Sequence, residues 1–339
     1  MSKVAVEGED VQQRRARPGR GTLGLALAVL SSATFGTSGT FAASLLAIGW
    51  TPGAAVTARI VIAVAVLTVP ALVIARRTPN VWRRGGRMLT AYGLVAVAGA
   101  QLCYFNAVSH LSVAVALLLE YGGILFVVGW MWLRHGQRPR RLTGLGAVAA
   151  IAGLVLVLNL IGDHHVDAIG VLWGLGAAVG LATYFVISAQ DEEPLPPLVF
   201  AWGGLVIGAA ALVLADLVGA LHYSAPHGQV TLLHTKLSWV VPVLGLSLIA
   251  AVVAYVTGIA GVRLLGARLA SFVGLVEVLF AIVFAWLLLG QSLTVLQLCG
   301  GALIIAGIAL VRVDEMRVDA ADELVMGDPE MVALERAAR

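Results

Sequence analysis

Three charged residues lie deep inside long apolar segments of the sequence. They are Arg59, Glu120 and Glu277. A charge at the centre of a bilayer costs at least about 2.5–3.5 kcal/mol, so each of these side chains is expected to face protein or water rather than lipid. A carboxyl there suits the amino group of a ligand or an exchangeable proton, and a guanidinium suits a carboxylate. The structural alternatives are that Glu120 pairs with an arginine and that the Arg59 side chain reaches the lipid headgroups.

Neutral polar side chains in neighbouring apolar segments accompany the three charges. Tyrosine hydroxyls and amides there either line a cavity or form ordinary hydrogen bonds between helices, and the sequence leaves both alternatives open. Together with the charged residues, they are candidates for binding a small-molecule substrate or for coupling its movement to protons. No catalytic residue, metal ligand or cofactor site is predicted. The candidates are Arg59, Gln101, Tyr104, Asn106, Glu120, Tyr121, Tyr184, Tyr255 and Glu277.

The composition explains why these charges stand out. Of the 339 residues, 60% are hydrophobic and only 12% are charged, whereas a soluble domain carries about 25% charged residues. The apolar residues fall in blocks of about 20, long enough for a helix to cross a hydrocarbon core of about 30 Å. The blocks lack the alternation that barrel strands show. The sequence therefore predicts an all-α polytopic membrane protein that has the lipid bilayer, and not nucleic acid, as its surroundings.

Ten apolar blocks are expected to form ten transmembrane helices, because only helices and closed barrels satisfy the backbone hydrogen bonds in lipid. The predicted spans of the first half are 22–48, 53–75, 88–108, 111–133 and 142–161. Those of the second half are 169–189, 197–219, 239–262, 269–289 and 293–312.

The distribution of basic residues predicts how the spans are oriented. With the N-terminus in the cytoplasm, all of the 22 Lys and Arg residues except Lys236 and Arg59 fall in the termini or in connections that follow even-numbered spans. Cytoplasmic connections carry such an excess of basic residues. We therefore expect a multi-pass protein of the plasma membrane, the inner membrane of a bacterium. Its N-terminal tail, residues 1–20, and its C-terminal tail, residues 313–339, are both predicted to be cytoplasmic.

The second half of the sequence repeats the first. Residues 111–157 align without gaps on residues 265–311. Because each half holds five spans, an odd number, the second copy must enter the membrane from the opposite side. We therefore predict two inverted-topology five-helix repeats, residues 21–161 and 168–312, with a substrate site between them near the midplane. Identical residues at equivalent positions include Trp132 and Trp286, Gly136 and Gly290, and Gln137 and Gln291.

Several short segments follow the pattern of a known family of membrane proteins. In the second repeat these are Leu-Gly-Ala-Arg-Leu-Ala-Ser at 265–271, Glu277, Leu-Leu-Leu-Gly at 287–290, Gln-Leu-Cys-Gly-Gly-Ala at 297–302 and Ala306-Gly307. In the first repeat they are Pro52 with Arg59, and Leu-Leu-Leu-Glu-Tyr at 117–121. Through these segments the sequence resembles the drug/metabolite transporter superfamily, specifically its EamA-type members with two five-helix repeats, over roughly residues 22–312.

The resemblance implies a function but no particular substrate. EamA-type proteins transport amino acids or other small metabolites, commonly outward, without hydrolysing ATP. The residue after Glu277 is Val278 where the family often has proline, and Gly136-Gln137 and Gly290-Gln291 replace a frequent Gly-Glu. The expected function is therefore export of amino acids or related metabolites by alternating access, with import or exchange as the alternative.

Spans 5 and 10 differ from the others because they carry few polar side chains. Their small residues permit close packing of helices. We predict that the two spans form the edge of the bundle, either as scaffold or as the contact of a homodimer. These small residues are Gly146, Ala150 and Gly153 in span 5, and Gly300, Gly301 and Gly307 in span 10.

Membrane-embedded enzymes and channels are also built from apolar spans of this kind. The sequence contains no H-E-x-x-H, G-x-S-x-G or G-x-x-x-x-G-K-[ST] motif, which argues against an enzyme and against transport driven by its own ATP site. Three ionisable residues inside the spans are few for a continuous pore. The sequence therefore favours a transporter that is not an enzyme.

Overall fold

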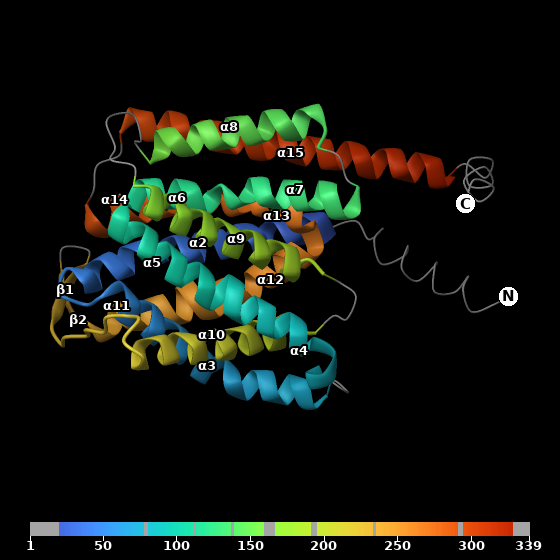
Figure 1. Ribbon diagram of the computed structural model, residues 1–339. Coiled ribbons are helices and arrows are strands. Elements are labelled where there is room, and N and C mark those ends of the chain that lie inside the picture. The colour runs from blue at the N-terminus through green and yellow to red at the C-terminus, as the bar shows by residue number, and fades with distance from the viewer. Residues whose placement is uncertain are drawn as a thin grey trace.

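The computed structural model describes residues 20–77, 81–111, 113–136, 139–158, 167–190, 195–232, 235–290 and 294–327. Its helices share one long direction and form a single bundle (Figure 1). Residues 1–19 and 328–339 of the two predicted tails lie outside the described residues.

The helices follow the two halves of the sequence. The first half contains α2 (Arg20–Leu46), α3 (Pro52–Arg76), α4 (Val81–Ala91), the π-helix η1 (Tyr92–Gly99), α5 (Ala100–His110), α6 (Val113–Tyr121), α7 (Gly123–His135) and α8 (Arg141–Val157). The second half contains α9 (Ala168–Ser188), α10 (Pro197–Leu217), β1 (Gln229–Leu232), β2 (Thr235–Ser238), α11 (Val240–Leu244), the π-helix η2 (Gly245–Val253), α12 (Ala254–Leu265), α13 (Ala267–Gly274), α14 (Val276–Leu289) and α15 (Val295–Gly327).

The predicted all-α membrane fold is confirmed. In the described residues, nine helical segments are long and apolar enough to cross a membrane, and they match nine predicted spans to within a few residues. The remaining predicted span is α8, a shorter apolar helix of 17 residues, about 26 Å long at the usual rise per residue. Large apolar side chains stay exposed on the outside of the bundle, including Leu133 and Leu217 at 85% and 77% exposure, as lipid-facing residues do.

Particular residues set where helices end and begin. Gly136 and Gly290, identical at equivalent positions, end α7 and α14 with left-handed backbones, at φ 66° and 70°. Glycine adopts this conformation without the steric cost that a Cβ would bring. The beginning of α3 is set by Pro52 in its first turn and by Thr51, whose hydroxyl accepts a hydrogen bond from the N–H of Ala54.

Four spans are irregular, and they form two equivalent pairs. The third and eighth spans contain the π-helical segments η1 and η2. The fourth span is interrupted at Gly122 between α6 and α7, and the ninth at Leu275 between α13 and α14. At each interruption a tight turn replaces the helical pattern, with the N–H of Leu125 donating to the Gly122 carbonyl and the N–H of Val278 to the Leu275 carbonyl. Interrupted helices at corresponding positions of two inverted repeats mark the substrate region of many transporters.

The two halves also pack their helices in the same way. A Cβ on Gly24 of α2 would lie 2.7 Å from the Cβ of Leu264 of α12. A Cβ on Gly170 of α9 would lie 2.7 Å from the Cβ of His110 of α5. His110 and Leu264 correspond when the alignment of 111–157 on 265–311 is extended by one residue. The pairs α2–α12 and α9–α5 are therefore equivalent, and Gly24 is the equivalent of Gly170.

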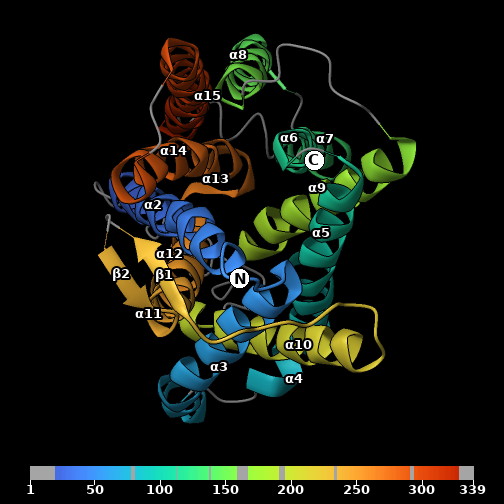
Figure 2. The same ribbon diagram turned by 90° about the vertical axis from the view of Figure 1, so that its left-hand side faces the viewer.

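The helices α8 and α15 lie against each other at one side of the bundle (Figures 1 and 2). A Cβ on Gly153 would lie 2.5 Å from the Gly300 carbonyl oxygen, and one on Gly146 would lie 2.8 Å from the Gly307 carbonyl oxygen. Most of the small residues predicted for scaffold or dimer contact therefore serve the packing of spans 5 and 10 within one chain. The homodimer stays a prediction.

The two ends of the bundle differ in chemistry. We call one end the arginine-rich end. There α3 ends at Arg76, the last turn of α12 contains Arg263, and α15 carries Arg312 and Arg317. At the other, the hairpin end, β1 and β2 form an antiparallel pair beside the C-terminus of α2 (Figure 2). Trp50 anchors the chain there, because its indole N–H donates to the Pro226 carbonyl at 2.8 Å.

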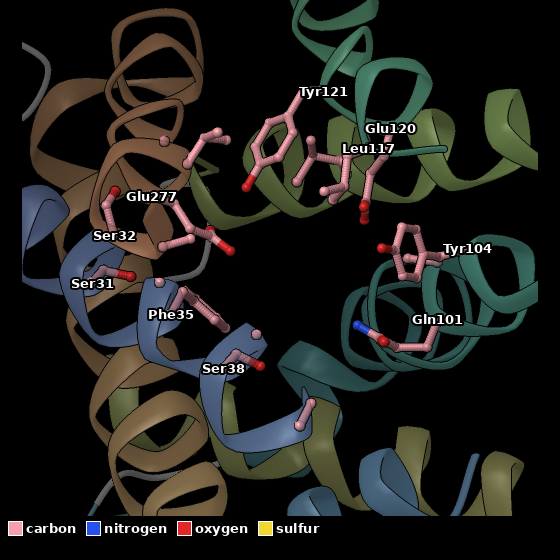
Figure 3. Close-up of a pocket in the computed structure, with 18 of the residues that line it drawn as sticks. Ser31, Ser32, Phe35, Ser38, Gln101, Tyr104, Leu117, Glu120, Tyr121 and Glu277 are labelled. Atoms are coloured by element: carbon pink, nitrogen blue, oxygen red, sulfur yellow. The ribbon is translucent and has the colours of Figure 1, made fainter. Parts of the chain in front are cut away.

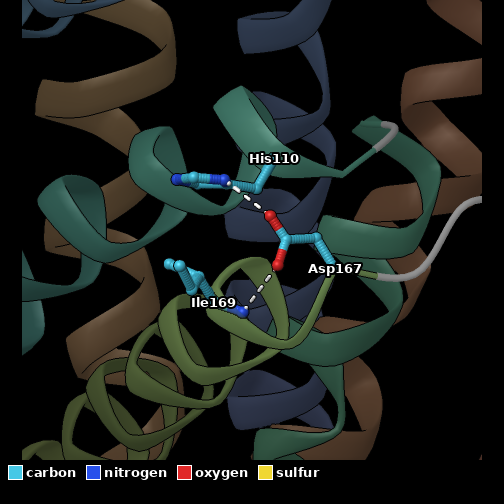
Figure 4. A network of polar contacts seen from close by, with 3 residues as sticks. All are labelled: His110, Asp167 and Ile169. Carbon is cyan, nitrogen blue, oxygen red and sulfur yellow. Dashed lines mark hydrogen bonds and ion pairs between the residues drawn. The ribbon is translucent and has the colours of Figure 1, made fainter.

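A polar contact near the hairpin end joins the two halves. Asp167 caps the N-terminus of α9 by accepting a hydrogen bond from the N–H of Ile169 at 3.0 Å. Its second carboxylate oxygen lies 2.9 Å from Nδ1 of His110, the last residue of α5 (Figure 4). The beginning of the second repeat is thus held against the end of the third span.

Candidate functional site

A cavity of about 680 Å³ lies between the two halves of the bundle. Its walls come from α2 and α3, from α5 and α6, and from α9, α12, α13 and α14. Figure 3 shows polar side chains from α2, α5, α6 and α14 pointing into a shared space. Among its lining residues, Leu46, Pro52 and Leu158 stand at helix ends of the hairpin end. The cavity therefore runs from the middle of the bundle towards the hairpin end.

Arg59 supplies the positive charge of the cavity wall. Its side chain is 6% exposed, and one terminal nitrogen donates to the Ser38 hydroxyl at 2.9 Å. The guanidinium also lies 5.9 Å from the centre of the Phe35 ring and bonds to the Tyr255 hydroxyl. Its Nε–H has no partner among the described residues. The structure places this guanidinium in the cavity wall rather than at the lipid headgroups, and leaves one of its donors unfilled.

Glu277 lies in the first turn of α14, directly after the interruption of the ninth span. A carboxylate is favourable there because the N-terminus of a helix carries partial positive charge. The Tyr121 hydroxyl donates a hydrogen bond to this carboxyl from across the cavity (Figure 3). Glu277 is therefore the carboxylate of the site that already has a hydrogen-bond donor, Tyr121, within the protein.

Glu120 lies at the corresponding interruption of the first repeat, two residues before Gly122. Its carboxyl points into the cavity beside Tyr104 (Figure 3), and no hydrogen bond or ion pair to it is found within the described part of the chain. The charges that act on it are those of Glu277, which repels it, and Arg59, which attracts it. Glu120 is therefore the carboxylate that is free to bind a cationic group.

Most of the neutral candidates also line the cavity. Gln101, Tyr104, Tyr184 and Tyr255 do so, with the first two from α5 and the others from α9 and α12. Asn106 does not belong to the lining, and its amide donates to the Leu102 carbonyl within α5 at 2.8 Å. The structure therefore brings together eight of the nine candidate residues and places Asn106 elsewhere.

An aromatic layer lies between the cavity and the arginine-rich end. Adjacent ring centres along the layer are 4.8–6.2 Å apart. At this end α12 and α13 both pack against α9, and a Cβ on Gly274 of α13 would lie 2.9 Å from the Phe185 ring of α9. The cavity is thus closed at the arginine-rich end. In order of contact, the aromatic residues are Phe35, Tyr255, Tyr184, Tyr92 and Phe200.

Sequence reasoning missed the contribution of the first span. Ser31, Ser32, Phe35 and Ser38 of α2 line the cavity, and their side chains appear along one side of Figure 3. The available signal was the unusual number of Ser and Thr residues between 31 and 44 of an otherwise apolar helix. Hydroxyls can bond to the backbone of their own helix, as Thr34 does to Leu30, so this signal alone does not separate a cavity wall from an ordinary helix.

The lining is chemically suited to small molecules that carry both charge and apolar groups. Arg59, Glu120 and Glu277 are the charged residues among its described members, so the carboxylates outnumber the guanidinium by one. The remaining wall is mostly apolar and aromatic. Two interrupted helices, two inverted repeats and a charged cavity between them define a polytopic membrane transporter.

The chain belongs to the EamA-like transporter family, whose model matches residues 22–159 and 168–313. This confirms the family that the sequence motifs resemble. In Bacillus subtilis (strain 168), the uncharacterized transporter YwfM is 28% identical over 221 residues, which cover 64% of this chain and 70% of YwfM. An uncharacterized transporter of Archaeoglobus fulgidus is 27% identical over 66% of this chain and 74% of its own length.

A solved structure confirms the fold independently of the sequence. A protein of known crystal structure superposes on this chain with a TM-score of 0.69. The superposition covers 87% of this chain and 98% of the other. Its sequence identity is 22%, so the likeness is one of architecture.

Proposed function

We propose that the protein is a secondary transporter that exports amino acids or related small metabolites by alternating access. The observation that carries this proposal is the cavity between the repeats, which presents a free carboxylate, Glu120, and a guanidinium, Arg59. An amino acid carries one group complementary to each. The apolar and aromatic wall offers room for a side chain.

The arginine-rich end is assigned to the cytoplasm in this proposal, in a plasma membrane. The excess of Lys and Arg at that end supports the assignment. The cavity, which runs towards the hairpin end and is closed at the other, then faces outward. Alternating access requires one such state and a second in which the closed and open ends are exchanged.

Protons are the proposed coupling ions. Glu120 and Glu277 both line the cavity, and only one guanidinium offsets their charges. A carboxyl that binds either the substrate ammonium or a proton would link the two movements in opposite directions. Tyr121, bonded to Glu277, would keep the second carboxyl in place during the exchange.

The test is untargeted mass spectrometry of the medium around cells that produce the wild type, Glu120→Gln or Asp216→Asn. Asp216 lies on α10 and outside the cavity lining, so its variant is the matched control for loss of a carboxylate. We expect one metabolite class to accumulate outside with the wild type and the control but not with Glu120→Gln. Equal accumulation with all three would refute the role of Glu120. No accumulation with any of them, at equal amounts in the membrane, would refute export and direct the work to uptake or exchange.

A further inference from the structure

The two ends of the bundle are packed differently although the repeats are equivalent. At the arginine-rich end, α12 and α13 pack against α9. The equivalent elements of the other half are α5, α6 and α2. Within the described residues α2 does not pack against α5 and α6 to a comparable extent, and the cavity occupies the space between them. The closed contacts at one end therefore indicate which residues meet when the other end closes.

The equivalence of Gly24 and Gly170 aligns the sequence of α2 with that of α9. In that register Ser38 is the equivalent of Tyr184, and Gly39 is the equivalent of Phe185. Phe185 is buried at 7% exposure. Gly39 lines the cavity, and a Cβ built on it would meet nothing within 4 Å. The same backbone position is thus packed in one repeat and open in the other.

The alignment of the repeats also identifies the residues that would face Ser38 and Gly39 when the hairpin end closes. It makes Glu120 the equivalent of Gly274, and, extended into the third and eighth spans, it makes Tyr104 the equivalent of Gly258. At the closed end, the Phe185 ring contacts Gly274, where a Cβ would lie 2.9 Å from the ring.

The transferred contact pairs residues of complementary size. At the closed end a large side chain, Phe185, faces a glycine, Gly274. At the open end the large side chain is Glu120 and the glycine is Gly39, so the order is reversed and one large side chain again faces a glycine. Figure 3 shows Ser38 on one side of the space and Glu120 and Tyr104 on the other.

Arg59 stands where the transferred contact would bring the Glu120 carboxylate. It bonds to Ser38 at 2.9 Å, next to Gly39, and its Nε–H lacks a partner among the described residues. In the present state no ion pair joins Arg59 and Glu120 within the part of the chain that the structure describes. Movement of α6 onto α2 would supply the missing acceptor to the guanidinium and turn its longer-range attraction for the carboxylate into a direct ion pair.

We propose that Glu120 and Arg59 form the ion pair that closes the hairpin end, and that a zwitterionic substrate binds by taking the place of this pair. The ammonium group occupies Glu120 and the carboxylate occupies Arg59. The proposal rests on the proposed transport function and deepens it, because it predicts a substrate with both charges rather than a simple cation or anion. The other titratable groups around Glu120 are Tyr104 of α5, Tyr121 of its own helix, Tyr255 of α12 and Glu277 of α14.

The experiment measures how readily a cysteine at the gate reacts with a membrane-impermeant maleimide added from outside. Cys103 and Cys299 are replaced by alanine, and Gly39→Cys is introduced, since its position has room for a side chain. Gln229→Cys on the exposed strand β1 is the control site. Gly274→Val is added in a parallel series, because it prevents the contact with Phe185 and thereby favours the state in which the hairpin end is closed.

We expect Gly274→Val to slow labelling of Gly39→Cys. In that background, Glu120→Gln and Arg59→Gln should each speed it up, by about fivefold or more, the lower end of usual couplings between sites. The charge exchange Glu120→Arg with Arg59→Glu should bring the rate back towards that of Gly274→Val alone. Labelling of Gln229→Cys should not change in any variant. If the charge exchange fails to slow labelling again, or if the single variants leave it unchanged, there is no ion pair at the gate.

Export measured in parallel separates this proposal from the proposed function. Export by the wild type together with charge-insensitive labelling would overturn the ion pair alone. Charge-sensitive labelling without export of any metabolite would overturn the exporter and leave the gate. Should Gly274→Val fail to reach the membrane, the three charge variants are compared in the Gly39→Cys background, where the same order of rates is expected.

Discussion

Gly153 is the position at which one added methyl group should most plainly disturb the bundle. A Cβ there would lie 2.5 Å from the Gly300 carbonyl oxygen and 2.8 Å from the Ile304 backbone nitrogen. Close carbon–oxygen contacts in proteins are about 3.3–3.6 Å, so α8 and α15 would have to separate by almost 1 Å. Neither neighbour is a flexible side chain that could turn away.

The size of the effect follows from two opposing contributions. Forcing an extra carbon into a well-packed contact costs about 1–3 kcal/mol. Alanine gains about 0.5–1 kcal/mol over glycine inside a helix. For Gly153→Ala we therefore expect a net loss between about 0 and 2.5 kcal/mol, centred on about 1 kcal/mol. Gly144 is the matched control on the same helix, because a Cβ there meets nothing within 4 Å, and Gly144→Ala should be neutral or stabilising.

The measurement is thermal unfolding of both purified variants in one detergent. At about 2–4 °C for each kcal/mol, Gly153→Ala should unfold a few degrees below the wild type and Gly144→Ala at or above it. Equal unfolding temperatures for the two variants would refute the close approach of α8 and α15. A change of oligomeric state in Gly153→Ala, without a change of unfolding temperature, would show instead that this face of span 5 contacts a second copy.

Two further predictions concern buried hydrogen bonds. Thr143 donates a hydrogen bond to the buried Asp314 carboxylate at 2.5 Å. Thr143→Val should therefore lower the free energy of unfolding by about 1.5–3 kcal/mol. Thr143→Ser keeps the hydroxyl and should retain most of the wild-type stability in the same thermal assay. Tyr121→Phe removes the donor to Glu277 and should reduce the export rate about tenfold, which corresponds to about 1.4 kcal/mol. The exposed residue Tyr223 provides the control Tyr223→Phe, and equal rates for the two variants would contradict the role of Tyr121.

The spans and the inverted repeat could be predicted from the sequence because they depend on local composition and on the odd number of spans in each half. Glu120 and Glu277 were found because a charge inside an apolar block is costly unless protein or water receives it. Arg59 was found in the same way, but its neighbours depend on how α3 meets α2, which no local pattern encodes.

The irregular parts of the helices could not be predicted. Glycines lie at both interruptions, with Gly122 and Gly123 in the fourth span and Gly274 before Leu275 in the ninth, but uninterrupted spans such as α9 contain glycines as well. The π-helical segment η2 contains only Gly245 and Ser247 besides its larger apolar residues and alanines, a composition that the regular spans share. These interruptions arise from packing between helices distant in the sequence, and only the three-dimensional arrangement shows that they fall at equivalent positions.

The small hairpin of β1 and β2 offers other proteins a binding surface at the end of the bundle. An apolar cluster that includes Leu45 of α2 and Val230 of β1 holds the hairpin to the bundle. The ring centre of Trp239, which follows β2, lies 5.7 Å from that of Trp50. Gln229, Thr231 and Lys236 remain exposed on it. An antibody fragment that recognises this hairpin together with the end of α2 would therefore bind at one end of the bundle without entering the cavity, and would mark that end for imaging.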